Sequence, residues 1–221
     1  MKKALLFVAA LILLSAITNA KDGNNPIKFK NGTGKNGTCF DESTHLLNVG
    51  IGFGFATYRS YGLGGGYSYG SSPLISVSYE QGWKKKLGPG YLGVGGFASF
   101  RTSHSRYDNY YYKNERYYYE HRWNYLTFAA RGIYHWDVLN TKNAEVYGGM
   151  LIGFRVTTYK YSSNSTDPDT QLYQRSDGGV MPVASFIAGA RWYFVPKVAL
   201  FGEAVGGVGT SFISGGVTFK W

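Results

Sequence analysis

The sequence predicts an all-β protein, an eight-stranded antiparallel up-and-down transmembrane β-barrel. The first of three supporting observations is composition: 44% of the 221 residues are hydrophobic, 18% are aromatic and 31 are glycine, about twice the usual glycine share. The second is that apolar side chains alternate with small or polar ones from residue 45 onward, which is the period of a β-strand. The third is that four tryptophans fall at the same end of the predicted strands.

Eight segments show this alternation. They are residues 46–58, 74–83, 91–102, 124–136, 145–158, 183–194, 198–208 and 211–221. In the first, Leu47, Val49 and Ile51 fall on one face, and Asn48 and Gly50 fall on the other. Because each segment has two chemically distinct faces, each is predicted to be a strand with one face on each side of a sheet.

The composition of the second face decides which side points outward. A soluble barrel or sandwich would place the polar face in water and would use Lys, Asp, Thr and Asn there. Here that face consists mainly of Gly, Ser and Ala with a few charged residues, which suits the narrow interior of a small closed barrel. The apolar face is therefore predicted to contact lipid, as in outer-membrane barrels.

The predicted connections alternate between long and short. The long ones are 59–73, 103–123 and 159–182, and the short ones are 84–90, 137–144 and 195–197. Outer-membrane barrels have long loops outside the cell and short turns on the periplasmic side. The last hairpin, near Gly209, is an exception because its outer loop is nearly absent.

Tryptophan placement agrees with this orientation. An aromatic girdle is predicted from Trp83, Trp136, Trp192 and Trp221, which all lie on the apolar face beside the short turns or the C-terminus. Amphipathic rings prefer the interface between lipid and water. This end of the barrel is therefore predicted to lie at the inner surface of the membrane.

The N-terminal region divides into two parts. Residues 1–20 have two lysines, an apolar stretch and a final small residue, the layout of a secretory signal peptide. Residues 21–44 show no periodicity and are predicted to be irregular. Cleavage after residue 20 would remove two lysines and lower the net charge from +10 to about +8. Secretion argues against a nucleic-acid partner, and Cys39, the only cysteine, excludes an intrachain disulfide.

Three segments carry a resemblance to a known family: "ARGIYHW" (130–136), "GARWYF" (189–194) and the terminal "GGVTFKW" (215–221). Over residues 45–221 the chain resembles the small eight-stranded outer-membrane barrels, the OmpA-like and porin-family β-barrels of Gram-negative bacteria. The resemblance implies location in the outer membrane with lipid as a partner. It also implies that Val217, Phe219 and Trp221 form the C-terminal signal that the barrel-assembly machinery reads, with Trp replacing the commoner terminal Phe.

Charged residues on the inward face form a predicted lumen charge cluster. Its members are Glu80, Arg101, Arg131, Arg155, Arg191, Glu203 and Lys220. Because a buried unpaired charge costs several kcal/mol, opposite charges at similar depth are expected to pair and to fill the lumen. The alternative is a narrow passive pore, which five cations and two carboxylates would make weakly selective for anions.

The segment "YDNYYYKNERYYYEHRW" (Tyr107–Trp123) joins two predicted strands on the long-loop side. Tyrosine offers a large, rigid contact area at low entropic cost. A surface contact is therefore predicted at Tyr110, Tyr111, Tyr112, Tyr117, Tyr118 and Tyr119. Part of the segment is predicted to continue the hairpin above the membrane, with rings alternating across its faces. The alternative to a contact surface is that these rings form an outer girdle and a stiff hairpin tip.

Catalysis is not expected from the residues available. The histidines are His45, His104, His121 and His135. Ser103 and Ser105 flank His104, but adjacency in a loop does not give the geometry of a nucleophile with its base. The sequence therefore predicts no catalytic residue, cofactor or metal ion. The predicted role is structural or one of surface interaction, with an unidentified surface ligand. The narrow passive pore is the second hypothesis, and a lipid-modifying enzyme is the third.

Overall fold

The structure is a computed structural model that describes residues 38–54, 66–136, 139, 141, 143–165, 178–208 and 212–221. Contacts divide the chain into Met1–Lys30 and Asn31–Trp221, and every described residue belongs to the second unit. The predicted signal peptide lies outside the described residues. Within the described ranges, no helix has the length and apolar character needed to cross a bilayer.

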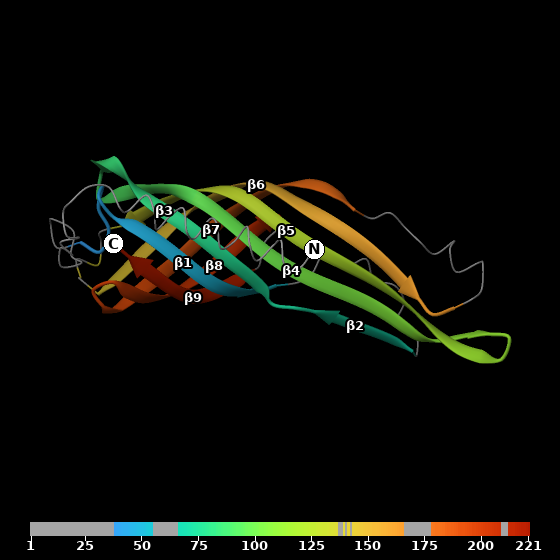
Figure 1. The fold of residues 1–221 in the computed structure, drawn as a ribbon. Coiled ribbons are helices and arrows are strands. Elements are labelled where there is room, and N and C mark those ends of the chain that lie inside the picture. Colours follow the sequence, from blue (N-terminus) through green and yellow to red (C-terminus); the bar gives the residue numbers. More distant parts are fainter. Residues whose placement is uncertain are drawn as a thin grey trace, which may run out of the picture. The chain divides into compact units, whose positions relative to one another are not determined.

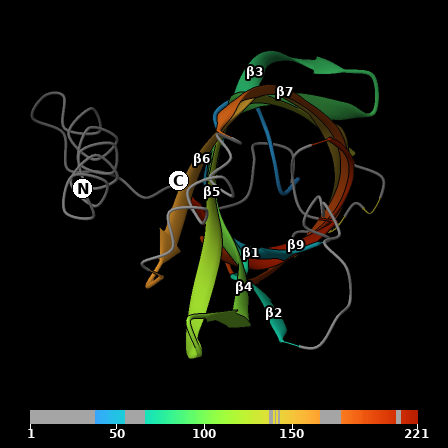
Figure 2. The same cartoon turned by 90° about the vertical axis from the view of Figure 1, so that its right-hand side faces the viewer.

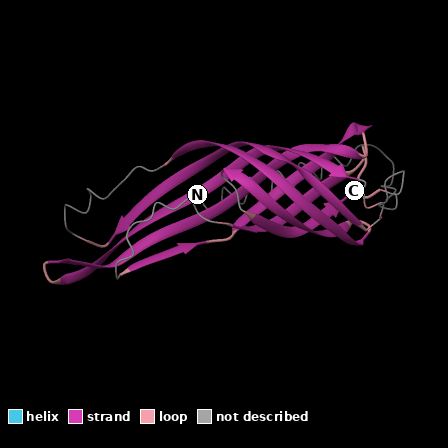
Figure 3. Ribbon diagram, turned by 180° about the vertical axis from the view of Figure 1, so that it is seen from behind, coloured by secondary structure: helices cyan, strands magenta, loops and turns pink. Residues whose placement is uncertain are grey.

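The second unit is a closed antiparallel barrel (Figures 1 and 2). Its strands are β1 (His45–Phe53), β2 (Tyr67–Ser71), β3 (Leu74–Leu87), β4 (Gly90–Tyr112), β5 (Glu115–Trp136), β6 (Ala144–Ser163), β7 (Gly179–Val195), β8 (Val198–Val208) and β9 (Ile213–Lys220). Apart from β2, which pairs with β4, each strand pairs with the next along the chain, and β9 pairs with β1 to close the ring. Figure 3 shows how the strands of the far wall cross those of the near wall obliquely.

Nine strands occupy eight positions in the barrel, because β2 and β3 share one position. Both pair with the same side of β4: Ser71 lies opposite Ser103, and Ile75 lies opposite Phe100. Pro73 separates them, and since proline has no N–H to donate, the hydrogen-bond ladder breaks there. The predicted eight-stranded up-and-down barrel is confirmed by this pairing.

Residues 103–123, predicted to be a long polar connection that in part continues the hairpin, are strand except at their tip. Strand β4 continues to Tyr112 and β5 begins at Glu115, so a two-residue turn joins them. Lys113 and Asn114 have φ values of 49° and 66°, as expected for a tight hairpin turn that follows the twist of its strands.

The other long connections also contain strand. Residues 67–71 of the predicted loop 59–73 form β2, and β6 and β7 extend into the predicted loop 159–182 as far as Ser163 and Gly179. Residues 55–58 of the first predicted strand lie outside the described residues, and β1 ends at Phe53.

Apolar side chains cover the outside of the barrel. The exposed ones include Val49, Ile51, Phe53, Ile75, Val77, Phe128, Met150, Ile152, Phe154, Phe186, Phe194, Leu200 and Ile213. The four predicted girdle tryptophans, Trp83, Trp136, Trp192 and Trp221, are 41–57% exposed on this outer face. A protein surrounded by water does not normally expose so continuous an apolar surface.

The inside of the barrel is mainly polar. Its buried polar side chains include Asn48, Ser78, Glu80, Ser99, Thr127, Arg131, His135, Glu145, Ser185, Arg191, Glu203, Ser214 and Thr218. A smaller apolar cluster of Ile133, Tyr147, Leu151, Ile187 and Val205 lies beside them. The interior is therefore packed with side chains.

The C-terminus helps to close the barrel. His45 and Trp221 exchange two backbone hydrogen bonds of 3.0 and 3.1 Å, and Phe219 lies opposite Leu47 on β1. Phe219 and Trp221 point outward, 44% and 48% exposed, and Val217 on the same face is half-buried. Recognition of these three side chains by the barrel-assembly machinery stays a prediction.

Candidate functional site

A network of ion pairs crosses the lumen and draws on five strands, β3, β5, β6, β7 and β8. Glu80 on β3 accepts hydrogen bonds of 2.9 Å from Arg131 on β5 and of 2.9 Å from Arg191 on β7, both at its Oε1 atom. Asn48 on β1 donates to the same oxygen at 3.1 Å. All three charged side chains are at most 1% exposed. Because each buried charge has a partner of opposite sign, the network avoids the cost of an isolated buried ion.

A second carboxylate joins the network at Glu145, the second residue of β6. Arg191 donates from Nη1 to Glu145 Oε1 at 2.5 Å, so this guanidinium bridges Glu80 and Glu145. His135 lies between the same two carboxylates, with Nε2 3.2 Å from Glu80 and Nδ1 3.5 Å from Glu145. These contacts join β3, β5, β6 and β7 across the barrel.

The third carboxylate, Glu203 on β8, lies on the other side of Arg131. Arg131 donates to both of its oxygens, and the hydroxyl of Tyr147 donates to Oε1 at 2.9 Å. The guanidinium of Arg191 lies 4.3 Å from the centre of the Tyr147 ring, a favourable cation–π arrangement. The lumen is therefore crossed at one level by charged and aromatic groups in direct contact.

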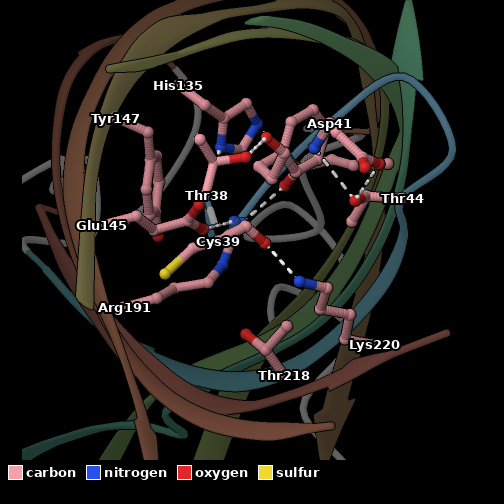
Figure 4. A network of polar contacts seen from close by, with 12 residues as sticks. Thr38, Cys39, Asp41, Thr44, His135, Glu145, Tyr147, Arg191, Thr218 and Lys220 are labelled. Atoms are coloured by element: carbon pink, nitrogen blue, oxygen red, sulfur yellow. Dashed lines mark hydrogen bonds and ion pairs between the residues drawn. The ribbon is translucent and has the colours of Figure 1, made fainter. Parts of the chain in front are cut away.

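Residues 38–44 enter the end of the barrel that carries the short turns (Figure 4). Phe40 stacks on His135 with ring centres 3.6 Å apart and an angle of 6° between the planes. Lys220 donates to the carbonyl oxygen of Cys39, and the thiol of Cys39 lies 3.2 Å from the carbonyl oxygen of Thr141. These contacts hold the segment against the charge network.

The segment is held by its own turn and by glycines in the wall. Asp41 Oδ1 accepts hydrogen bonds of 2.9 Å from the Ser43 N–H and 2.9 Å from the Thr44 hydroxyl. A Cβ atom at Gly82 would lie 2.1 Å from the Asp41 carbonyl oxygen, and one at Gly93 would lie 3.1 Å from Phe40. Glycine at these two positions leaves room for the segment beside the strands.

The structure brings four of the seven predicted cluster residues together: Glu80, Arg131, Arg191 and Glu203. The other three lie apart. Arg101 and Arg155 lie higher on β4 and β6, where neither forms an ion pair with a described residue. Lys220 lies at the opposite end, in contact with the segment at Cys39.

The prediction omitted two inward carboxylates, Glu145 and Asp41. Glu145 could have been found from the sequence, because it shares the odd-numbered inward face of β6 with Arg155. Asp41 lies in a segment with no periodicity, so no pattern marked it. Adding both changes the count to four carboxylates against five cations. The predicted excess of three cations, on which weak anion selectivity depends, is thereby reduced to one, since five minus four is one.

At the other end, the sheet continues beyond the closed barrel as an extension of four strands, β2, β4, β5 and β6 (Figure 1). Tyr67 lies opposite Tyr107, which lies opposite Tyr119, which lies opposite Ser163. We call this part the aromatic extension; it comprises β2, the end of β4 from Ser103, the start of β5 to Trp123 and the end of β6 from Thr158.

The two faces of the aromatic extension differ in chemistry. Its aromatic face continues the lumen-facing side of the strands and carries Tyr67, Tyr69, Tyr107, Tyr110, Tyr117, Tyr119, His121, Trp123, Tyr159 and Tyr161. Its charged face carries Arg106, Arg116, Glu120, Arg122 and Lys160. Strand alternation accounts for this separation, since the rings and the charges occupy alternate positions.

The rings of the aromatic face form a continuous series across the strands. Tyr67 and Tyr107 have ring centres 4.4 Å apart, and Tyr107 and Tyr119 are 5.2 Å apart. His121 continues the series 5.7 Å from Tyr119 and lies stacked 5.9 Å from Trp123. The hydroxyl of Tyr159 lies 2.6 Å from His121 Nδ1. Such cross-strand pairs each stabilise a sheet modestly, by roughly 0.2–1 kcal/mol.

On the charged face the side chains pair locally. Arg106 lies 2.7 Å from Asp108, and Arg122 lies 2.6 Å from Glu120. The hydrogen bond to Asp108 raises the pKa of the Arg106 guanidinium. Arg106 also lies 4.0 Å from the centre of the Tyr118 ring. These contacts pair Arg106 and Arg122 with carboxylates, whereas Arg116 donates to the carbonyl oxygen of Asp108.

The six tyrosines of the predicted contact surface do not share one face. Tyr110, Tyr112, Tyr117 and Tyr119 lie on the aromatic side, whereas Tyr111 and Tyr118 lie on the charged side. The aromatic face also includes Tyr67, Tyr107, His121, Trp123 and Tyr159, which the prediction left out. The alternation in "YYYEHRWNY" could have placed His121 and Trp123 on the aromatic face. The pairing of β2 with this sheet is visible only in the folded structure.

The known proteins that resemble this chain resemble it in fold alone. No protein-family model and no curated protein matches it. It is similar to the N-terminal β-barrel domain of Pseudomonas aeruginosa OprF, at 14% identity over 82% of this chain and 98% of that one, with a TM-score of 0.39. It is also similar to Yersinia pestis Ail in complex with the heparin analogue sucrose octasulfate, at 9% identity over 80% and 99%, with a TM-score of 0.37.

A second structure of Ail, in a phospholipid bilayer nanodisc, is similar at 13% identity over 81% of this chain and all of that one, with a TM-score of 0.35. These likenesses concern the fold alone. The predicted resemblance to small eight-stranded outer-membrane barrels is confirmed at that level by the closed barrel itself.

Proposed function

We propose that this protein is an integral outer-membrane β-barrel that presents the aromatic extension as a binding surface outside the cell. Its apolar exterior supports the membrane location, because the exposed side chains of β1, β3, β5, β6 and β7 would otherwise lie in water. The tryptophans support the orientation, since Trp83, Trp136, Trp192 and Trp221 lie at the end with the short turns.

Strand length supports the position of the extension outside the membrane. A barrel strand crosses the hydrocarbon layer with about 9–11 residues. Strands β4 and β5 have 23 and 22 residues, so roughly half of each lies beyond that layer. Strand β9, with 8 residues, lies entirely within the closed barrel.

The filled lumen favours a surface role over the passive pore. At one level, Glu80, Arg131, Arg191 and Glu203 contact one another across the barrel. Below them, the segment around Phe40 packs against His135. A conducting path needs polar groups that line an open passage, whereas these groups contact one another across the lumen.

The observation that carries the proposal is the separation of rings from charges on the extension. The barrel closes below it without its help, through the pairing of β9 with β1. Rigid tyrosine and tryptophan rings that hold a fixed arrangement suit a contact surface, because little side-chain entropy is lost on binding.

Replacing Asp108–Glu120 with a short Gly-Ser linker tests this role. We expect the barrel still to assemble, because the pairs from Ile75 to Leu87 and from Trp123 to Trp136 remain. Cells that express the variant should lose binding to host-cell monolayers and to neighbouring bacteria. Assembly is measured by the faster migration of the unheated protein on a denaturing gel.

The matched control replaces charges on the opposite face, with Arg122→Gln and Lys160→Gln in one variant. This variant retains the rings and should retain cell binding. Undiminished binding by the linker variant would remove the interaction role from this hairpin. Failure of the linker variant to assemble would show that the extension serves the barrel structurally, as a stiff hairpin.

A further inference from the structure

Two arginines near the outer mouth differ from the other inward arginines of the barrel. Arg131 and Arg191 are buried and contact carboxylates, whereas Arg101 and Arg155 are half-buried and form no ion pair with a described residue. Since arginine stays protonated in proteins, the mouth carries two positive charges that the described part of the chain does not neutralise.

The contacts of these two side chains leave donors for a ligand. Arg101 donates to the Ser71 hydroxyl at 2.8 Å and to the Gly54 carbonyl oxygen at 3.1 Å, both neutral acceptors. Arg155 has its Nη2 atom 3.4 Å from the sulfur of Met181, and its buried Nε atom has no hydrogen-bond partner. Because the Arg155 guanidinium is only half-buried and its one hydrogen bond is to sulfur, a weak acceptor, an anion in the mouth would offer it stronger acceptors.

Both arginines lie at the foot of the aromatic face. Arg101 pairs with Tyr125 across β4 and β5, and the Arg155 guanidinium lies 5.2 Å from the centre of the Tyr125 ring. The backbones of β4 and β6, on either side of β5, are roughly 10 Å apart. Trp123 and Tyr159 follow directly above Tyr125, 5.7 Å apart. Arg155 therefore borders the rings directly, whereas the Arg101 guanidinium extends toward Ser71 and Gly54 on the other side of β4.

From these contacts we propose that the outer mouth binds an acidic glycan, with separate sugar carboxylates at Arg155 and at Arg101 and sugar rings stacked on Trp123 and Tyr159. The planar guanidinium matches a carboxylate with two parallel hydrogen bonds. The C–H groups on one face of a sugar ring suit the electron-rich face of an aromatic ring. The hydroxyls around the sugar suit the phenol groups of Tyr119 and Tyr159. This inference rests on the proposed surface location.

Charge separation on the extension favours this ligand over a long polyanion bound by charge alone. The cations Arg106 and Arg122 belong to the charged face and already contact Asp108 and Glu120. The aromatic face offers flat neutral rings instead, with positive charge concentrated at its foot. A ligand that fits therefore combines neutral rings with localised acid groups.

The test measures binding of an oligogalacturonate to the full protein in lipid nanodiscs, by surface plasmon resonance. The same oligosaccharide with its carboxylates methyl-esterified serves as the neutral ligand with identical rings. We expect the acid form to bind at least about tenfold more tightly than the ester, since hydrogen bonds between charged groups are the strong ones. Binding should weaken as salt is raised.

Four variants locate the site. Arg101→Gln and Arg155→Gln should each weaken binding of the acid form by about tenfold or more and leave the ester unaffected. Trp123→Ser should weaken both forms. Lys160→Gln, on the charged face of the same sheet, should change neither. Migration of the unheated protein on a denaturing gel verifies that each variant forms a barrel.

Equal binding of acid and ester, or equal losses in Lys160→Gln and Arg155→Gln, would overturn the proposal. Tighter binding of single-stranded DNA or of a polyglutamate peptide than of the oligogalacturonate would also overturn it. If the Gly-Ser linker abolishes cell binding while the wild-type protein binds no acidic oligosaccharide, the surface role stands and the glycan assignment fails.

Discussion

Replacing Arg191 with alanine is expected to lower the free energy of unfolding by about 3–5 kcal/mol, the usual cost of removing one partner of a buried ion pair. Arg191 is fully buried and contacts both Glu80 and Glu145. Its loss leaves Glu145 beside His135 alone and leaves Glu80 dependent on Arg131. Urea titration of the detergent-solubilised barrel, followed by tryptophan fluorescence, measures the change.

Arg155→Ala is the matched control for this prediction. It removes the same side chain from the same inward face, but at the mouth, where Arg155 forms no ion pair with a described residue. We expect a loss below about 1 kcal/mol there. Adding Glu145→Gln to Arg191→Ala should recover part of the loss, because it removes an unpaired carboxylate. Equal losses for the two arginine variants would show that the network does not stabilise the barrel.

Gly95→Ala is expected to destabilise the barrel by at least about 1–3 kcal/mol or to prevent its assembly, because overpacking forces the backbone to move. Gly95 lies on β4 between Glu80 on β3 and Arg131 on β5. A Cβ atom there would lie 1.7 Å from the carbonyl oxygen of Tyr79. Strand β3 would have to shift, and Glu80, the next residue, would shift with it.

The adjacent Gly96 provides the control. It points outward, and a Cβ atom there would meet no heavy atom within 4 Å. Gly96→Ala should therefore assemble normally, with a free energy of unfolding within about 0.5 kcal/mol of the wild type. Heat modifiability and urea titration of both variants give the comparison. Similar stability of the two variants would contradict the close approach of β3 and β4 at the level of the charge network.

The alternation of apolar with small or polar residues predicted the barrel, because outward positions of its strands are mainly apolar and inward positions are mainly small or polar. Ile51 and Gly52 show this: one is apolar and exposed, and the next is small and buried. In residues 103–123 the strands extend further than predicted. The two faces there are aromatic and charged, as at Trp123 and Arg122, so the alternation of apolar with small residues that marks the barrel strands is missing.

The charge network was only partly accessible from the sequence. Inward positions at similar depth could be recognised, so Glu80 and Arg131 were expected to meet. Glu145 was overlooked at the first position of its predicted strand, although it shares the odd-numbered face with Arg155. The segment at residues 38–44 makes its contacts with residues far along the chain, such as Cys39 with Thr141. No local pattern specifies contacts of that kind, because they depend on the diameter of the closed barrel.

Cysteine labelling in intact cells tests the proposed arrangement most directly. Glu115→Cys places a thiol at the exposed tip of the extension, and Asn143→Cys places one at an exposed position between β5 and β6, at the opposite end. The native Cys39 is buried, so the wild-type protein gives the background. A maleimide that cannot cross the outer membrane should label Glu115→Cys in intact cells and Asn143→Cys only after permeabilisation. Labelling of Asn143→Cys in intact cells, with Glu115→Cys protected, would contradict the proposed orientation and the binding role of the aromatic extension.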